Sequence, residues 1–463
     1  MLMTFRWLAV ALILAVSVPI SAETERPPLE EMPHGFQIAF WMNQAALAFN
    51  DGDFSDWAIA TEKLHALRPY NQDFMTHLVK AYAQTGQISK AFNTMLMMQQ
   101  QGLAEDWDKL DEVAPLRSHR LYNHLSDLMS QAGQPFGQAE TFAMLDSGIA
   151  MPEALTHDPR SGRFFIGTIR DGHIRYSRDG NSWTTFASPD THEGLMAVFD
   201  LAVDAERGHL WVATGAAPQF EGFSSGTQGH AVLLKLDLES GDLISTHSLP
   251  QDGNARLPGS LALTSDGTIF AADANTPIVY RLEPGDEQLQ PFFSHQNFSS
   301  LRGLAVSADG QRLYVADYEV GILVIGLGDN RQAWKLHVPE TLNEGGIDGL
   351  YWWNNHLVAI QNGVTPQRVL RLELGPDGLG VIAVAPVVAA LEEFDVPTFG
   401  TMVGDSLYFF AASHWSRVDS HGRPTAGELP SIPILKANVD SPELMVVGRD
   451  LIEEMQRQQQ NQP

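Results

Sequence analysis

Residues 301–317 read LRGLAVSADGQRLYVAD, and this stretch decides the fold. A short apolar strand comes first, a turn follows at Asp309-Gly310, and a second strand rich in β-branched and aromatic residues comes after the turn. Turns of this kind join antiparallel strands because Gly accepts a positive φ without steric cost. The stretch therefore predicts a β-hairpin.

The same strand–turn–strand plan occurs six times after residue 150. The second strands read RFFIGT from Arg163, HLWVAT from His209, TIFAAD from Thr268, RLYVAD from Arg312, HLVAIQ from His356 and SLYFFA from Ser406. The first strands begin near Glu153, Phe199, Gly259, Arg302, Asp348 and Phe399, which are 43 to 60 residues apart. This spacing suits four-stranded blades, and six blades close a ring without long exposed edges. We therefore predict a mainly β fold with a six-bladed β-propeller at residues 150–440.

Third strands are expected after each hairpin, for example IVYRL in the third repeat and WSRVD at residues 415–419 in the sixth. The second repeat is the longest, and its additional residues fall in the loop 216–229. A β-sandwich is the alternative architecture, but six copies of one unit favour the ring.

A different period precedes the propeller. Gly52 and Gly86 lie 34 residues apart, and each separates two stretches of helical apolar periodicity, while Pro69 falls where a helix pair should end. A 34-residue helix–turn–helix period resembles the tetratricopeptide repeat. We predict an α-helical repeat domain at residues 35–145, after a linker at 23–34. Such arrays usually bind peptides on a concave face, so an envelope protein or peptide is the expected partner.

The N-terminus predicts export. Arg6 precedes an apolar run from Trp7 to Val18, and small residues up to Ala22 offer a cleavage site. The apolar run is too short for a stable membrane span, so residues 1–22 are predicted to be a signal peptide that leaves no span after cleavage. The expected location is the periplasm or the medium. Residues 441–463 end in QRQQQNQP and are predicted to form a solvated tail.

Composition narrows the classes of partner. The chain has 463 residues, no cysteine and a net charge of −27. Without cysteine there is no disulfide framework and no lipid linked through a thiol. The negative charge argues against binding to nucleic acid or to an anionic membrane, because both need a basic patch.

Three stretches of the propeller resemble the regucalcin/gluconolactonase family, which is also called the senescence-marker-protein family. They are PEALTHDPRSGRFFIG from Pro152, LRGLAVSADGQRLYVAD from Leu301 and IDGLYWWNNHLVAI from Ile347. Strictosidine-synthase-like and paraoxonase-like propellers are wider relatives. The resemblance covers about residues 150–440 and implies a hydrolase of lactones or related esters.

In that family a Glu, an Asn and an Asp at the starts of three inner strands hold a divalent cation that polarises a lactone carbonyl. The resemblance places these ligands at Glu153, Arg302 and Asp348. It therefore implies Ca²⁺, Zn²⁺ or Mn²⁺ bound by Glu153 and Asp348. Arg302 departs from the pattern, because Arg offers only donors and a positive charge where Asn offers an oxygen ligand. A metal-free alternative follows, in which Arg302 bridges the two carboxylates.

Further polar residues are expected at the same end of the ring. Arg302, Asn362, Trp415 and Asp273 are candidate substrate-binding residues, and the alternative for Asp273 is a cap of its own turn. Asp348 and His414 are candidate catalytic residues. The unperturbed pKa of a His side chain lies near neutrality, which suits a general base, although a single His beside a Trp also suits a structural role.

Three functions remain open at this point: a hydrolase of lactones or esters with or without a metal, a non-catalytic scaffold, and a small-molecule binder with the loop 216–229 as a lid. A deep pocket that holds Glu153 and Asp348 unpaired, with strongly shifted pKa values, would favour an enzyme. A mouth filled by Phe199, Phe399 and an Arg302 salt bridge would favour a scaffold. The fold alone does not decide, because propellers host many unrelated functions.

Overall fold

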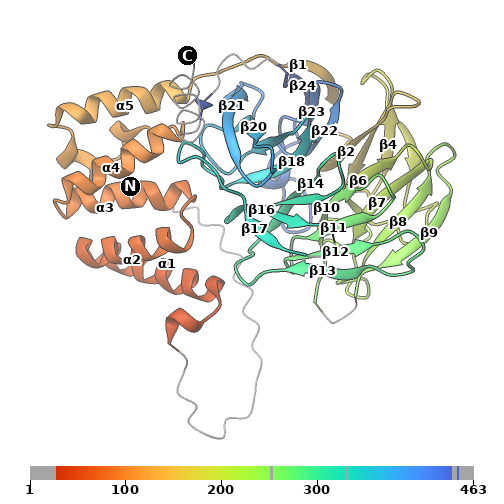
Figure 1. The fold of residues 1–463 in the computed structure, drawn as a ribbon, viewed down its shortest axis with the longest axis horizontal. Helices are drawn as coiled ribbons and strands as arrows, with labels where there is room; N and C mark the ends of the chain where they lie inside the picture. Colours follow the sequence, from red (N-terminus) through yellow and green to blue (C-terminus); the bar gives the residue numbers. More distant parts are fainter. Residues whose placement is uncertain (1–27, 251–253, 329–330, 441–445, 448–463) are drawn as a thin grey trace, which may run out of the picture.

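The computed structural model describes residues 28–250, 254–328, 331–440 and 446–447. It has two regions, with helices on one side and a ring of β-sheets on the other (Figure 1). The predicted signal peptide, and the predicted tail apart from residues 446–447, lie outside the described residues. Within the described chain, no helix has the length and apolar character needed to cross a membrane.

Five α-helices form the first region. They are α1 His34–Asp51, α2 Phe54–Leu67, α3 Gln72–Gln84, α4 Ile88–Gln100 and α5 Arg120–Ala132, with short 3₁₀ helices at Leu29–Glu31, Trp107–Lys109 and Asp111–Leu116. Gly52 and Gly86 follow α1 and α3 with φ of 74° and 71°, a left-handed conformation that Gly adopts readily at helix ends. The expected helix–turn–helix pairs are confirmed, and the tetratricopeptide assignment stays a prediction.

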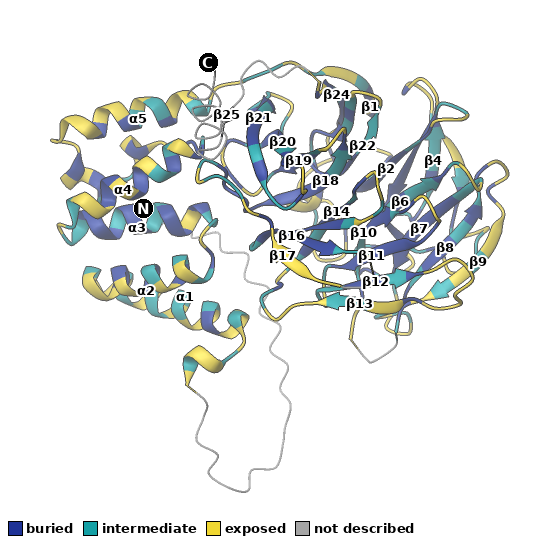
Figure 2. Cartoon of the chain, viewed as in Figure 1, coloured by how far each residue is buried: buried dark blue, intermediate teal, exposed yellow. Residues whose placement is uncertain are grey.

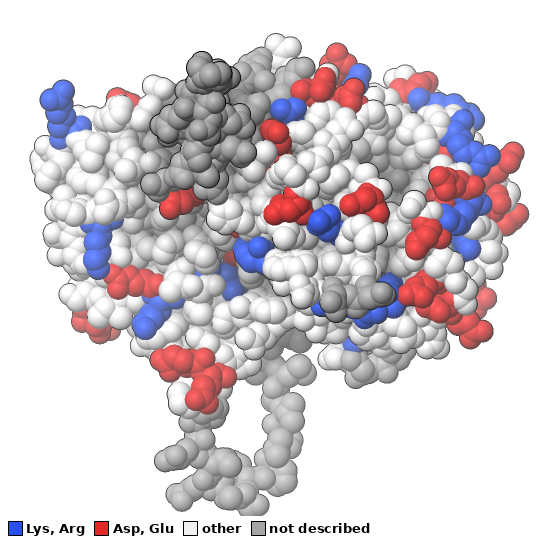
Figure 3. Space-filling model, viewed as in Figure 1, with Lys and Arg blue, Asp and Glu red and all other residues white. Residues whose placement is uncertain are grey.

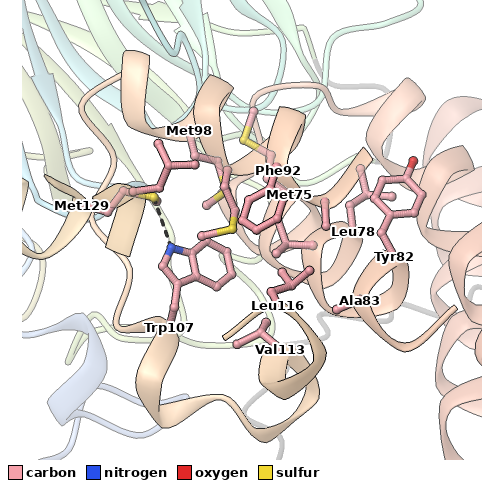
Figure 4. Packing of buried hydrophobic residues seen from close by; sticks show 14 of the residues in the cluster. Met75, Leu78, Tyr82, Ala83, Phe92, Met98, Trp107, Val113, Leu116 and Met129 are labelled. Carbon is pink, nitrogen blue, oxygen red and sulfur yellow. Dashed lines mark hydrogen bonds between the residues drawn. The ribbon is translucent and has the colours of Figure 1, made fainter. Parts of the chain in front are cut away.

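The core of the helical region lies between α3, α4 and α5. Met75, Phe92, Met98 and Trp107 pack together there, and Trp107 Nε1 donates a hydrogen bond to Met129 Sδ at 3.1 Å (Figure 4). Figure 2 shows α3 mostly buried, whereas α1 carries mainly intermediate and exposed residues. The outer helix pair is therefore less covered than the pair beside the propeller.

Six antiparallel sheets form the second region, and each is one blade. Blade 1 contains β2 Pro152–Asp158, β3 Arg163–Thr168, β4 Ile174–Ser177 and β5 Thr184–Ala187. Blade 2 contains β6 Ala197–Asp204, β7 His209–Gly215, β8 Ala231–Asp237 and β9 Leu243–Ser248. Blade 3 contains β10 Pro258–Leu263, β11 Ile269–Asp273, β12 Ile278–Leu282 and β13 Gln290–Ser294. Blade 4 contains β14 Leu301–Val306, β15 Arg312–Asp317, β16 Gly321–Gly326 and β17 Ala333–Lys335. Blade 5 contains β18 Ile347–Trp353, β19 His356–Gln361, β20 Arg368–Leu374, β21 Val381–Ala389 and β25 Val446–Val447. Blade 6 contains β22 Gly400–Val403, β23 Ser406–Phe410, β24 Ile432–Asn438 and β1 Glu140–Leu145.

The first strands β2, β6, β10, β14, β18 and β22 contact one another in sequence, and β22 contacts β2. The six-bladed propeller is thereby confirmed. Ring closure is made by β1, which comes before the first blade in the chain and pairs antiparallel with β24 of the last blade. This corrects the expected boundary at residue 145, because 140–145 belongs to the propeller. The pairing covers the outer edge of the last blade.

The sixth blade differs from the sequence expectation in a second way. The expected third strand WSRVD is a 3₁₀ turn at Trp415–Arg417 and the start of a loop, and the third strand is β24. The segment 432–438 has buried apolar residues along most of its length, which the segment 415–419 does not offer. Burial of that apolar face against the neighbouring blades decides which segment joins the sheet.

The two regions meet at blade 5. Val364, in the loop between β19 and β20, belongs to the apolar core of the helical region. In the same loop Thr365 N donates to Gln72 Oε1 at 2.7 Å, and Thr365 O accepts from Ala104 N at 2.7 Å. Arg368 Nη1 donates to the carbonyl oxygen of Gln101 at 3.0 Å. The loop 362–365 is therefore held by the helices, and it begins at Asn362.

Candidate functional site at the mouth of the propeller

A β-bulge occurs near the start of five of the six first strands. The register shifts lie at or beside Glu153, Phe199, Gly259, Arg302 and Asp348. A bulge re-aims the side chain of its extra residue. Because these strands surround the central channel, the bulges place equivalent residues around one end of it, which we call the mouth.

Three of the predicted residues come together at the mouth. Arg302 Nε lies 3.7 Å from Asp348 Oδ1. The charges of Asp348 and Arg302 both act on Glu153, as does burial. Phe199 is buried at the equivalent position of blade 2 and supplies an apolar wall. Neither carboxyl group is unpaired, because Asp348 faces Arg302 and Glu153 accepts from Trp415, so of the features expected for an enzyme the raised pKa values are present. The Arg302 ion pair and the buried Phe199 and Phe399 are the features expected for a scaffold.

The two mouth carboxyl groups are almost inaccessible to solvent, with Glu153 8% and Asp348 6% exposed. Burial raises the pKa of Glu153 to about 8, the nearby charge of Asp348 adds to the shift, and the Trp415 hydrogen bond and Arg302 oppose it. Burial also raises the pKa of Asp348, against the opposing effects of Arg302 and Asn362. Glu153 is thus protonated at neutral pH and can donate a proton.

The side chains around these carboxyl groups form two hydrogen-bonded groups, one at each carboxyl. Asn362 Nδ2 donates to Asp348 Oδ2 at 2.9 Å, and Asn362 Oδ1 accepts from the Tyr318 hydroxyl at 2.9 Å. Trp415 Nε1 donates to Glu153 Oε2 at 2.9 Å. The structure therefore brings Asn362 and Trp415 to the mouth, as the sequence predicts.

Among the charged side chains at the mouth, Arg302 is the one that solvent reaches most. Its guanidinium lies over the Tyr318 ring, 5.6 Å from the ring centre, and its side chain is 34% exposed. Trp415 is 39% exposed beside it. Within the described chain, the terminal nitrogens of Arg302 make no hydrogen bond, so they can donate to a ligand.

Asp273 lies outside these two groups and caps its own turn. It is fully buried, its Oδ1 accepts from Leu257 N and Asn275 N at 3.0 Å each, and its Oδ2 faces Arg256 Nη1 at 3.2 Å. A carboxylate held by this many protein donors has no free face for a substrate. The expectation of substrate binding is corrected here to the turn cap that was its alternative.

His414 also has a structural role. Its Nδ1 accepts a hydrogen bond from Met151 N at 3.1 Å, and its Nε2 lies 2.8 Å from the carbonyl oxygen of Pro430, to which it donates. Burial lowers the pKa of the ring. Because the Nδ1 lone pair is already in use, the ring cannot act as a general base without losing this bond. The catalytic expectation for His414 is corrected accordingly.

Two polar residues deeper in the channel were not predicted from the sequence. Asp200 follows the bulge residue of blade 2, and its carboxylate accepts from Leu261 N at 2.6 Å and Leu201 N at 2.8 Å. Burial raises the pKa of Asp200 to about 7. Tyr351 accepts from Gly400 N at 2.6 Å. Both line a cavity of about 180 Å³ that is walled by the first strands of all six blades.

The residues at the mouth do not fit a divalent cation. The guanidinium of Arg302 occupies the position at which the resemblance expects an oxygen ligand, and its charge lies next to Asp348. In the described ranges, no group of three or more Asp, Glu, His or Cys side chains is arranged to hold a metal. No chemistry at the mouth is therefore derived through a metal.

No protein-family model matches the sequence, and no curated protein matches it. Similar solved structures include a candidate gluconolactonase, with 17% identity and a TM-score of 0.44, covering 66% of this chain and 94% of that one. Regucalcin from Agrobacterium tumefaciens, a calcium-binding protein, has 18% identity and a TM-score of 0.45, covering 67% and 96%. Virginiamycin B lyase from Staphylococcus aureus has 14% identity and a TM-score of 0.41, covering 65% and 99%.

The structural neighbours are gluconolactonase- and regucalcin-like propellers. A fold alone does not determine the chemistry that a protein performs. What the mouth does has to follow from its own residues.

Proposed function

We propose that the mouth binds lactones or related esters and hydrolyses them without a metal. The observation that supports this most is the combination of a buried, protonated Glu153 with the accessible guanidinium of Arg302. One group can donate a proton and the other can stabilise negative charge on oxygen, which are the two needs of ester hydrolysis. Asp348, beside Arg302, supplies the carboxylate.

The proposed reaction uses each group once. The carbonyl oxygen of the substrate accepts hydrogen bonds from the terminal nitrogens of Arg302. Water adds to the carbonyl carbon and its proton passes to Asp348, while the negative charge that forms on the carbonyl oxygen faces Arg302. The bond to the leaving oxygen then breaks, and that oxygen takes the proton of Glu153. Transfer of the proton from Asp348 to Glu153 restores the site, and the product is a hydroxy acid or an acid and an alcohol.

The test is a panel of γ- and δ-lactones and p-nitrophenyl esters, assayed with and without EDTA. We expect hydrolysis that EDTA does not change and that Arg302→Met reduces about a hundredfold or more. Arg312→Met is the matched control, because Arg312 lies on the same blade and is paired with Asp309 at 3.6 Å. Loss of activity with EDTA, full activity in Arg302→Met, or no hydrolysis of any substrate contradicts the proposal.

A second candidate function is favoured by the helical region, which we propose as a binding surface for a peptide or envelope protein. A groove of about 410 Å³ lies between α1, α2 and α3, and its lining is almost entirely apolar. Phe36, Phe40 and Leu47 of α1 are 52%, 38% and 51% exposed. Exposed apolar surface of this kind marks interaction sites.

The discriminating experiment is capture of peptides from a random display library by the whole protein. Ala46→Glu places a charge in the groove, and Leu121→Glu places one at an exposed apolar position of α5 outside it. We expect the first variant to lose the selected peptides and the second to keep them. Equal behaviour of the two variants contradicts a role for the groove.

We also propose that the protein acts outside the cytoplasm, on the basis of the apolar run from Trp7 to Val18 and the small residues before Glu23. N-terminal sequencing of the protein recovered from cell fractions tests this. A mature N-terminus at Glu23 in the periplasmic or medium fraction is expected. Recovery of the intact N-terminus in the cytoplasm contradicts it.

A further inference from the structure

A second pocket lies between blades 2 and 3, away from the mouth. Its volume is about 270 Å³, and its wall comes from β7, β8, β9 and the turns after β6, β10 and β12. The lining of the pocket includes the side chains of His209, Trp211, Lys235, Asp204 and Glu283. Asp204 is the last residue of β6, whereas the mouth lies at the start of that strand. The pocket is therefore at the opposite end of the blade from the candidate active site.

Trp211 lines this pocket and carries a buried donor that has no acceptor among the described residues. The residue is 5% exposed, its Nε1 is buried, and Nε1 has no hydrogen-bond partner within the described chain. The buried Nδ1 of His209 is likewise without a partner among the described residues. A buried polar group left without a partner costs stability, so its presence on a pocket wall points to a ligand that completes it.

Lys235 is the basic side chain on the wall that has no acidic partner, and Asp286 is the acid on the wall that has no basic partner among the described residues. Lys235 Nζ lies 5.4 Å from the centre of the Trp211 ring and forms no ion pair with the described residues. The acids on the wall are already engaged: Asp204 with Arg207 at 3.1 Å and Glu283 with Arg281 at 2.9 Å. The third acid, Asp286, accepts from the backbone N–H of Glu283 at 3.3 Å.

The chain carries a net charge of −27, and on the face seen in Figure 3 the coloured Lys and Arg side chains mostly stand among Asp and Glu side chains. The other aromatic neighbour, His247, has both ring nitrogens engaged, with Ser245 Oγ at 2.8 Å and the carbonyl oxygen of Glu287 at 3.1 Å. Lys235 and the indole N–H of Trp211 are thus the donors left to a ligand.

We propose that this pocket binds a compact oxyanion, a carboxylate or a phosphate, whose oxygens accept from Trp211 Nε1 and Lys235 Nζ. Hydrogen bonds that involve an ionised group are roughly twice as strong as neutral ones, so an anion is favoured over water at these donors. The volume corresponds to on the order of nine water molecules at about 30 Å³ each, which suits a small anion rather than a polymer. The site is independent of the mouth and of its proposed reaction.

The test follows the indole N–H signals of ¹⁵N-tryptophan-labelled whole protein during titration with inorganic phosphate and, separately, with sodium acetate. Trp211→Phe assigns the Trp211 signal and removes no hydrogen bond within the described chain. Trp183 is the matched control, because its Nε1 is also buried without a described partner but lies outside this pocket. We expect a saturable shift of the Trp211 signal with at least one of the two anions, and none at Trp183.

Lys235→Met and Lys235→Gln remove the charge at a partly exposed position and are expected to fold. Each should weaken the anion at least about tenfold, because a charge-assisted hydrogen bond is lost. Saturation with phosphate only or with acetate only assigns the anion. The proposal fails if neither anion shifts Trp211, if Trp183 shifts equally, if sodium chloride gives the same shift, or if both Lys235 variants bind as well as the wild type.

Discussion

Two kinds of buried acid stand at the same end of the propeller. The mouth carboxyl groups, Glu153 and Asp348, have side chains as their polar partners. Trp415 donates a hydrogen bond to Glu153, Asn362 donates one to Asp348, and Arg302 forms an ion pair with Asp348. The cap carboxylates, Asp273 and Asp317, accept hydrogen bonds mainly from backbone N–H groups. Asp317 accepts from the N–H groups of four residues, at 2.7 to 3.0 Å: Ser299, Ser300, Glu319 and Val320.

The difference lies in how the negative charge is stabilised. Several fixed backbone donors stabilise a carboxylate in place, because they are oriented by the fold and cost nothing further to arrange. Glu153, whose donor is the Trp415 indole, instead favours the protonated form, whereas Asp348 faces both the Arg302 guanidinium and Asn362, which oppose the rise of its pKa. Burial alone therefore does not mark a functional acid, whereas burial with few donors does.

The largest expected effect is a loss of stability when the cap carboxylate Asp317 is removed. Asp317→Ala leaves four backbone N–H groups without their acceptor in a buried turn. We expect a loss of about 3 kcal/mol or more in the free energy of unfolding, from the cost of unpaired buried groups. Urea unfolding at neutral pH measures it.

Glu153→Gln is the matched control for that experiment. Glu153 is protonated at neutral pH, so the amide replaces a neutral group of similar size. We expect no loss but a gain on the order of a few kcal/mol at neutral pH, because the wild type must take up a proton on Glu153 when it folds and the amide need not. Equal losses in Asp317→Ala and Glu153→Gln would remove the distinction between cap and mouth acids.

The second prediction concerns pH. The pKa of Glu153 is raised from an ordinary value of 4.5 to about 8 in the folded protein, so the folded state binds more protons than the unfolded state between these values. Stability must therefore fall as the pH rises through this window. Relative to Glu153→Gln, the wild type should lose on the order of a few kcal/mol between about pH 5 and pH 8.

Unfolding of both proteins by urea across this pH range measures the difference. The carboxyl ¹³C signal of Glu153, assigned with the Gln variant, should titrate over the same range. A constant difference between the two proteins, or a ¹³C midpoint near the ordinary value for Glu, would show that burial does not hold the proton on Glu153.

The third prediction restores an oxygen ligand at the mouth. Arg302→Asn removes the guanidinium beside Asp348 and offers a carbonyl oxygen instead. We expect this variant to bind one Ca²⁺ per chain, seen by calorimetry, and to gain about 2–4 °C in Tm with excess Ca²⁺. The wild type should show neither effect. Stoichiometric Ca²⁺, Zn²⁺ or Mn²⁺ on the wild type that Glu153→Gln abolishes would show that Arg302 does not exclude the metal.

The ring and the mouth were predictable because both come from a repeated local pattern. The six starts, including Glu153, Arg302 and Asp348, are aligned by the hairpins that follow them, and the bulges lie where that alignment puts them. Arg302 stands out through the resemblance to the regucalcin/gluconolactonase family, which implies an Asn at this position, and the structure places its guanidinium beside Asp348.

What the sequence could not predict depends on distant partners. β1 joins the last blade because Leu145 pairs with Ile432, across almost the whole propeller. The role of His414 is set by Met151 and Pro430, which no local pattern connects to it. Asp200 was missed because a bulge turns consecutive residues toward the channel, whereas strand alternation predicts that the neighbour of a mouth residue points away.

The smallest expected effect tests the single donor of Glu153. Trp415→Phe keeps an aromatic ring at the mouth but removes the indole N–H that donates to Glu153 Oε2 at 2.9 Å. This hydrogen bond lowers the pKa of Glu153, so its loss should raise that pKa further above about 8. The added shift should be about one unit or less, since one hydrogen bond contributes about 1 kcal/mol.

The ¹³C titration of Glu153 in Trp415→Phe measures this shift, and Trp334→Phe is the control, because Trp334 is 38% exposed on β17 and does not contact Glu153. A lower midpoint in Trp415→Phe would mean that the indole acts mainly by excluding water rather than as a donor. An unchanged midpoint would mean that Glu153 has another donor, and the mouth acids would then differ from the cap acids only in degree. A raised midpoint, with none in the control, shows that the number of donors sets where the proton resides.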